Sequence, residues 1–291
     1  MKNTLKSIMR HGSIGTIFFT AMFLVSCATN NELPEKSTDQ KKSEIYYGQG
    51  TNELVKKNYS QALINLVKAK EFNPTDSQVR NNLGMAYYFR EQPELAEKEL
   101  LKAIDLDQKN SDARVNLGSI YMEKNRLKEA RVQYELVLQD LTYLNQFRNY
   151  YNLAILALKE GDRATAFEYL SKSIKEREEY CQAHFKLGEL YFEEYKFKQA
   201  LTSFQESAKG TCVAEPAPHY QQALALMNLN RFEESRIKLK EIMDKFPKSR
   251  FNTLAGFQLK KITAQLHEQS ASGTFQTEVI KESKTIESPN F

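Results

Sequence analysis

The sequence predicts an all-α fold of six helix hairpins followed by one C-terminal capping helix. A glycine recurs every 34 residues, at Gly50, Gly84 and Gly118. Each is followed by an alanine and then by a large apolar residue, at Ala62 and Leu66, Ala96 and Leu100, and Ala130 and Tyr134. Repetition at this period predicts stacked hairpins. Small residues let two helix axes approach closely, while bulky neighbours fill the grooves beside them.

The pattern continues for three more copies after a slip of two residues. Their equivalent positions are Ala154, Ala166 and Leu170, then Gly188, Ala200 and Phe204, then Ala223, Ser235 and Leu239. The first copy differs from the others, because Glu53 stands where they favour tyrosine or leucine. We therefore expect repeat 1 to be a terminal, atypical unit.

Four of these copies have similar sequences around the small residue. They are Asn82-Leu83-Gly84-Met85-Ala86-Tyr87, Asn116-Leu117-Gly118-Ser119-Ile120-Tyr121, Asn152-Leu153-Ala154 and Lys186-Leu187-Gly188-Glu189-Leu190-Tyr191. Pro74 and Pro247 stand where a helix must stop, since proline lacks an N–H and clashes with the preceding turn. The pattern resembles the tetratricopeptide (TPR) repeat. The resemblance implies a right-handed TPR superhelix, with six repeats over residues 43–248.

Residues 1–26 have the features of an export signal. Lys2, Lys6 and Arg10 precede an apolar run, 14–25, that is too short for a membrane-spanning helix. The run ends in Leu24-Val25-Ser26-Cys27, which resembles the bacterial lipobox. That resemblance implies cleavage before Cys27, lipidation of its sulfur, including a palmitate-type acyl chain, and anchoring at the periplasmic face of the outer membrane, which Ala28 favours. The alternative is an ordinary signal peptide in which Cys27 is incidental.

Three segments flank the repeats. Residues 27–42 are polar and contain Pro34, which is typical of a flexible tether. Residues 249–268 carry apolar side chains at helical spacing, and we expect a helix that covers the last hairpin. Residues 269–291 are rich in Ser, Thr, Glu and Lys, which predicts a disordered tail.

Charge gives no sign of nucleic-acid binding. Loss of the signal peptide leaves 38 basic against 37 acidic residues, with both signs interspersed. Cys181 and Cys212 remain in the exported chain, where the compartment would be oxidising. They lie at the two ends of one predicted hairpin, and these two ends meet on the same side. They form either a disulfide, worth about 3 to 4 kcal/mol in the chain-entropy model, or two free thiols.

Motifs for catalysis are missing from the sequence. It contains no phosphate-binding glycine loop, nucleophile elbow, His-Glu-x-x-His or Cys-x-x-Cys motif. His184 and His219 occupy one repeated position that TPR domains use for packing. We therefore expect a protein that is not an enzyme, with no cofactor, no metal and no small-molecule substrate, and monomeric apart from its protein partner.

The first helices of TPR hairpins line a binding groove, and this analogy gives the candidate contact residues. They are Tyr47, Leu54, Met85, Tyr88, Met122, Tyr151, Ile155, Phe185, Phe192 and Tyr220. Aromatic and methionine side chains supply adaptable contact area, although about half of the inward side chains are expected to pack between repeats. TPR domains that hold acidic tails place lysines at positions occupied here by Tyr47, Asn81, Val115 and Tyr151. An apolar or extended peptide is therefore favoured.

Taken together, the lipobox, tether, repeats and capping helix resemble the type IV pilus pilotin family. The irregular join from Leu138 to Asp162, with a tyrosine-containing loop before an Asn-Leu-Ala helix, and Phe246-Pro247-Lys248-Ser249 carry the closer likeness. The resemblance implies an outer-membrane lipoprotein that helps the secretin PilQ insert or multimerise. The alternative is a general periplasmic TPR scaffold for outer-membrane protein assembly, or for proteases and peptidoglycan enzymes.

Overall fold

A computed structural model of the chain describes residues 36–271, except the side chains of residues 269–271. The expected signal peptide, Cys27, most of the tether and residues 272–291 lie outside the described residues. Within residues 36–271 the all-α prediction is confirmed, since they contain only helices and their connections. The α-helices are α1 (Thr38–Val55), α2 (Tyr59–Phe72), α3 (Ser77–Phe89), α4 (Pro93–Leu106), α5 (Ser111–Glu123), α6 (Leu127–Leu138), α7 (Gln146–Lys159), α8 (Arg163–Glu176), α9 (Cys181–Glu193), α10 (Phe197–Ser207), α11 (Pro216–Asn228), α12 (Phe232–Lys245) and α13 (Arg250–Ala271), with a short 3-10 helix at Gly210–Cys212.

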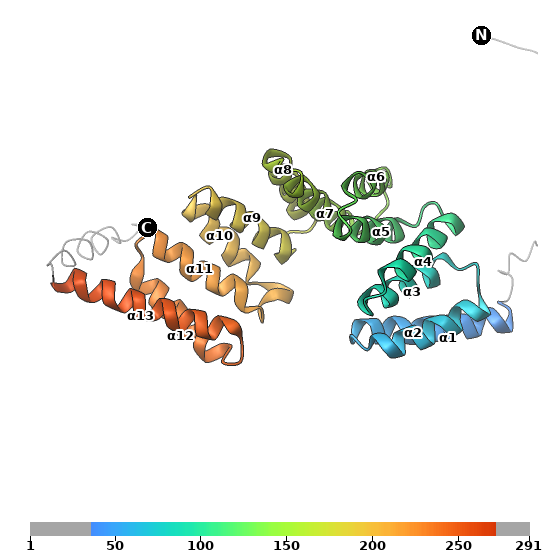
Figure 1. The fold of residues 1–291 in the computed structure, drawn as a ribbon, viewed down its shortest axis with the longest axis horizontal. Coiled ribbons are helices and arrows are strands. Elements are labelled where there is room, and N and C mark those ends of the chain that lie inside the picture. The colour runs from blue at the N-terminus through green and yellow to red at the C-terminus, as the bar shows by residue number, and fades with distance from the viewer. Residues whose placement is uncertain (1–35, 272–291) are drawn as a thin grey trace, which may run out of the picture. The chain divides into compact units, whose positions relative to one another are not determined.

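The helices pair as six consecutive hairpins, α1 with α2 through α11 with α12. Figure 1 shows this order along the chain. The second helix of each hairpin packs against the first helix of the next, and α13 packs against both α11 and α12, as expected of a capping helix. None of the described helices is long and apolar enough to cross a membrane.

Two glycines show why the repeat needs a small residue inside its first helix. A Cβ atom on Gly118 would lie 2.5 Å from Cε1 of Tyr134, whose side chain is completely buried. A Cβ on Gly188 would lie 2.6 Å from the ring of Phe204, which is also completely buried. In these two hairpins the helices can therefore approach this closely only because a side chain is missing at the crossing.

Replacing Gly118 by alanine is expected to lower the free energy of unfolding by about 1 to 3 kcal/mol, because the methyl group overlaps the Tyr134 ring. Gly48 is the matched control, since it is exposed within α1 and a Cβ there meets nothing within 4 Å. Alanine at position 48 should stabilise the helix by about 0.5 to 1 kcal/mol. Urea denaturation of both variants tests the pair, and equal effects would contradict this account of the crossing.

The ends of several helices are fixed by local polar chemistry. The Asp76 carboxylate accepts hydrogen bonds from the backbone N–H groups of Gln78 and Val79, and so caps α3. Asn110 caps α5 in the same way through Ala113, while Pro93 takes the first position of α4, where no N–H is needed.

Each hairpin turn contains one residue with positive φ, seven positions after the small residue at the helix crossing. These residues are Lys57, Glu91, Asn125, Gly161, Tyr195 and Asn230. The left-handed conformation costs an ordinary L-residue about 1 to 2 kcal/mol, yet a glycine stands there in the fourth repeat alone. The six turns therefore share one backbone geometry, which the packing of the flanking helices imposes.

The irregular join between α6 and α7 is held by side-chain hydrogen bonds. Asp140 Oδ1 accepts from the backbone N–H and the hydroxyl of Thr142, at 3.1 and 2.7 Å. The Tyr143 hydroxyl donates to Asp112 Oδ1 on α5 at 2.6 Å. The longer spacing in the sequence therefore corresponds to a hydrogen-bonded loop that contacts α5 of the third hairpin.

The structure corrects two of the expected boundaries. Helix α1 begins at Thr38, so residues 38–42 belong to the first hairpin and not to the tether. Contact with α2 holds this first turn, because Lys42 Nζ lies 5.0 Å from the ring centroid of Phe72. Within α1, Lys42 Nζ also lies 3.5 Å from Asp39 Oδ1. At the other end α13 continues to Ala271, beyond the expected end at residue 268.

The uncovered side of α1 explains the unusual sequence of repeat 1. In α3, Leu83 and Ala86 pack against Ala62 and Leu66 of the preceding hairpin. The equivalent positions in α1 are the polar residues Gln49 and Asn52, and both are exposed. Since no described hairpin packs on this side, polar residues there are what a terminal repeat requires.

Candidate interaction surface

The ten residues expected to line a groove lie on the first helices of the six hairpins, and all but Tyr220 are partly exposed. Helix α1 contacts α3, α3 contacts α5, and α5 contacts α7. Seven of the candidate residues lie on these four successive helices. We call their surface the first-helix face, and its members are Tyr47, Leu54, Met85, Tyr88, Met122, Tyr151 and Ile155.

The three remaining candidates are engaged within the fold. The ring centroid of Phe185 lies 5.7 Å from that of the buried Phe204, and the centroid of Phe192 lies 6.4 Å from it. Tyr220 is buried and packs on Phe251 of α13, with 5.4 Å between ring centroids. These residues are therefore placed to stabilise the fifth and sixth hairpins.

Asparagine side chains join the first helices to one another. Asn82 Nδ2 donates to Thr51 Oγ1 at 2.9 Å, which links α3 to α1. Asn116 Nδ2 donates to Asn81 Oδ1 at 2.8 Å, which links α5 to α3. Sequence reasoning did not assign these asparagines a role, although the repeated strings contain them. Their hydrogen bonds fix neighbouring first helices in register.

The tyrosine hydroxyls of the first-helix face have raised pKa values. Burial raises the pKa of Tyr47, and the carboxylates of Asp76 and Asp112 raise it further. Burial also raises the pKa of Tyr88, as does the nearby carboxylate of Glu123. These tyrosines therefore remain protonated hydroxyl donors at neutral pH.

Cys181 and Cys212 are joined by a disulfide, with their Cα atoms 6.2 Å apart. Cys181 begins α9, and Ser43 and Ser77 are its counterparts in earlier hairpins. Ser43 Oγ donates to the Ala69 carbonyl at 2.9 Å, and Ser77 Oγ to the Ala103 carbonyl at 2.8 Å. A covalent bond therefore closes the fifth hairpin at the end where a hydrogen bond closes the first two.

The two repeated histidines have structural contacts. His184 Nε2 lies 2.8 Å from the Glu178 carbonyl oxygen, and His219 Nε2 lies 3.3 Å from that of Val213. Arg80 and Arg114 make the equivalent contacts in earlier repeats, with the carbonyls of Pro74 and Gln108. The position therefore holds the turn before each helix. Across residues 36–271, no group of three or more His, Cys, Asp or Glu side chains is arranged to hold a metal ion.

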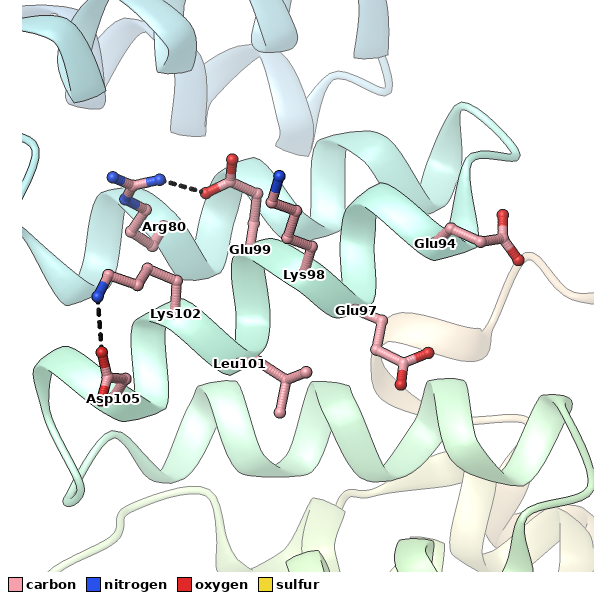
Figure 2. Close-up of a pocket in the computed structure, with 8 residues that line it drawn as sticks. All are labelled: Arg80, Glu94, Glu97, Lys98, Glu99, Leu101, Lys102 and Asp105. Atoms are coloured by element: carbon pink, nitrogen blue, oxygen red, sulfur yellow. Dashed lines mark hydrogen bonds and ion pairs between the residues drawn. The ribbon is translucent and has the colours of Figure 1, made fainter.

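A hollow of about 640 Å³ lies beside α4, and its lining is mostly charged. Figure 2 shows Arg80 directed toward Glu99, and Lys102 toward Asp105, at 2.8 and 2.6 Å. Lys70 adds a second ion pair to Glu99, and Lys124 and Arg126 pair with Glu97. Because these groups satisfy one another, the hollow is better explained as an ionic network that links hairpins than as a ligand site.

Three family models match the chain, at residues 81–142, 147–180 and 219–249, and each describes a tetratricopeptide repeat. The chain is built from TPR repeats. The matched segments lie on the second, third, fourth and sixth hairpins, so the periodicity seen in the sequence and the observed hairpins describe the same units.

Two bacterial pilus proteins are similar to this TPR chain. Type IV pilus assembly protein PilF of Pseudomonas aeruginosa is 26% identical over 197 residues, which cover 67% of this chain and 78% of that protein. A solved PilF structure from the same organism covers 77% of this chain and all of its own, with 21% identity and a TM-score of 0.65. The crystal structure of PilW, described as a widely conserved type IV pilus biogenesis factor, has 17% identity and a TM-score of 0.64, covering 73% of this chain and 97% of its own.

Proposed function

We propose that this chain is an outer-membrane lipoprotein of type IV pilus assembly, a pilotin that binds the secretin PilQ through its first-helix face. The observation that carries the proposal is the similarity to PilF over 78% of that protein's length. Lipidation of Cys27, which follows the signal-like segment, would hold the protein at the periplasmic face of the membrane. Binding alone would then bring secretin subunits together at the place where they assemble.

The shape and chemistry of the first-helix face support a protein partner. Tyr47, Tyr88 and Tyr151 each combine a large ring with a hydroxyl, and Met85 and Met122 adapt to irregular surfaces. Such side chains are enriched at the centres of protein interfaces. The asparagine hydrogen bonds hold the first helices together before a partner arrives, which lowers the cost of ordering the surface on binding.

Gene deletion tests the role. Without this protein, PilQ should be present but monomeric, and heat-resistant PilQ multimers on denaturing gels are the measurement. The wild-type chain should restore the multimers, whereas Cys27→Ser should fail because the protein is no longer anchored. Tyr88→Ala with Met122→Ala should reduce the multimers several-fold, because the two changes remove partner contact area.

Leu101→Ala is the matched control, since this side chain is 47% exposed on α4 and lies apart from the first-helix face. It should restore multimers as the wild type does. Normal PilQ multimers in the deletion strain would reject the pilotin role. Co-purification from detergent-solubilised membranes of a β-barrel assembly component or a hydrolase in place of PilQ would indicate the scaffold alternative.

A further inference from the structure

Helix α13 is packed on one side and exposed on the other. Ala255 and Ile262 are completely buried among residues of α11 and α12. Figure 1 shows α13 lying beside α12, with which it makes most of its contacts. On the opposite side Phe257 is 69% exposed and Leu254 is 42% exposed. The last helix of the described chain therefore presents large apolar side chains that no described helix covers.

The exposed side chains of α13 recur at a regular spacing. Along one line of the helix, successive exposed residues are alternately four and three positions apart. We call this line the outer seam of α13, and its members are Arg250, Leu254, Phe257, Lys261, Ala264 and Glu268. Alternation of three and four is the spacing with which one helix packs lengthwise along another. The outer seam therefore has the pattern that a second helix requires.

The charge along α13 is basic and is not balanced by the protein's own carboxylates. Residues 248–268 contain Lys248, Arg250, Lys260 and Lys261, all exposed, but Glu268 is their only carboxylate. Among the described residues, no carboxylate forms an ion pair with any of these four cations. Helix α12 differs, because its lysines and arginines pair with glutamates of the same helix. The outer side of α13 therefore offers cations that a partner can pair with.

Two of these cations lie where they can reach a helix docked on the seam. Lys260 and Lys261 follow Phe257 by three and four residues, so they lie on either side of the line from Phe257 to Ala264. A helix on that line would set its apolar strip against Phe257 and Ala264. Its flanking side chains would then lie beside the two ammonium groups, where carboxylates form the ion pairs typical of paired helices.

We propose that the outer seam of α13 binds an acidic amphipathic helix of another protein. This site goes beyond the proposed function, because it shares no residue with the first-helix face. A second copy of this chain suits the seam less well, since the same cations would then meet one another. The seam is also narrow and interrupted by Lys261, whereas helices that lie on membranes carry a broad apolar face.

Two labelled synthetic peptides test the proposal. Both have the length of α13, with leucines alternately three and four residues apart, and they differ only in carrying glutamate or lysine at the flanking positions. Fluorescence anisotropy with the full chain at physiological salt should show that the glutamate peptide binds at least about tenfold more tightly. Its affinity should fall as salt is raised, because the lysines are exposed.

Charge reversal tests the flanks of the seam. Lys260→Glu with Lys261→Glu should weaken binding of the glutamate peptide at least about tenfold and make the lysine peptide the tighter ligand. The matched control is Lys98→Glu with Lys128→Glu, which makes the same change of charge at exposed positions of α4 and α6 and should leave the preference unchanged.

Phe257→Ala tests the apolar part of the seam and should weaken binding of the glutamate peptide about five- to tenfold. Leu101→Ala, which shortens an exposed side chain on α4, should have no effect on binding. Equal binding of the two peptides, binding of neither, or an unchanged preference after charge reversal would overturn the proposal, as would binding that does not respond to Phe257→Ala.

The other possible occupants give different results, and each would overturn the proposal. A dimer in sedimentation that Phe257→Ala abolishes would assign the seam to a second copy. Pelleting with phosphatidylglycerol vesicles, without binding of either peptide, would assign it to a membrane surface. Binding of the glutamate peptide only after deletion of residues 272–291 would assign it to that segment of the chain.

Discussion

Replacing both Cys181 and Cys212 by serine should lower the free energy of unfolding by about 3 to 4 kcal/mol, since the bond closes a loop across 31 residues of sequence. The loss should be greatest in α9 and α10, because the disulfide joins the start of α9 to the 3-10 helix that follows α10. Serine suits position 181 in particular, because Ser43 and Ser77 close the earlier hairpins from the same position.

Hydrogen exchange with and without reductant measures this effect. Amides of α9 and α10 in the wild type should exchange faster once the bond is reduced, whereas those of the double serine variant should not respond. Amides of α1 to α4 provide the internal reference, because those helices contain neither cysteine. An equal response of all hairpins, or none, would contradict a local role for the bond.

Phe204→Ala should be the most damaging single substitution considered, with a loss of about 3 to 5 kcal/mol in the free energy of unfolding. Its side chain is completely buried and packs with Phe185, Phe192 and residues of α11. Truncation would leave a cavity between α9 and α10, because Gly188 on the facing helix has no side chain to fill it.

Phe257→Ala is the control for Phe204→Ala, because Phe257 is 69% exposed on α13. Its effect should stay within about 0.5 kcal/mol. Urea denaturation followed by circular dichroism compares the two variants. A small effect at position 204, close to that at position 257, would mean that the fifth hairpin repacks around the missing ring.

The positions of the hairpins could be predicted from the sequence because each helix crossing requires a small residue opposite a large one. Gly118 must face Tyr134, and Gly188 must face Phe204, so small and large residues recur together. The start of α1 could not be predicted, since it depends on Lys42 meeting Phe72 thirty residues later. From composition alone, a polar segment predicts a tether, because the sequence does not reveal such a contact.

The groove residues, too, could be predicted only in part. Repeat spacing identifies which side chains share one side of the first helices, but not which of them a neighbour covers. Phe185 and Phe192 meet Phe204, and Tyr220 meets Phe251 of α13. The asparagine bonds were missed because a donor and its acceptor lie about one repeat apart, as Asn82 and Thr51 do.

Because each hairpin packs mainly on its immediate neighbours, heat or denaturant can unfold part of the chain before the rest. In such a row, stability is close to a sum of units and junctions, so one end can melt while the other persists. Loss of α9 to α13 would leave α1, α3 and α5 with the neighbours they already have. A chain melted at that end would therefore keep its first-helix face, and calorimetry should resolve more than one transition.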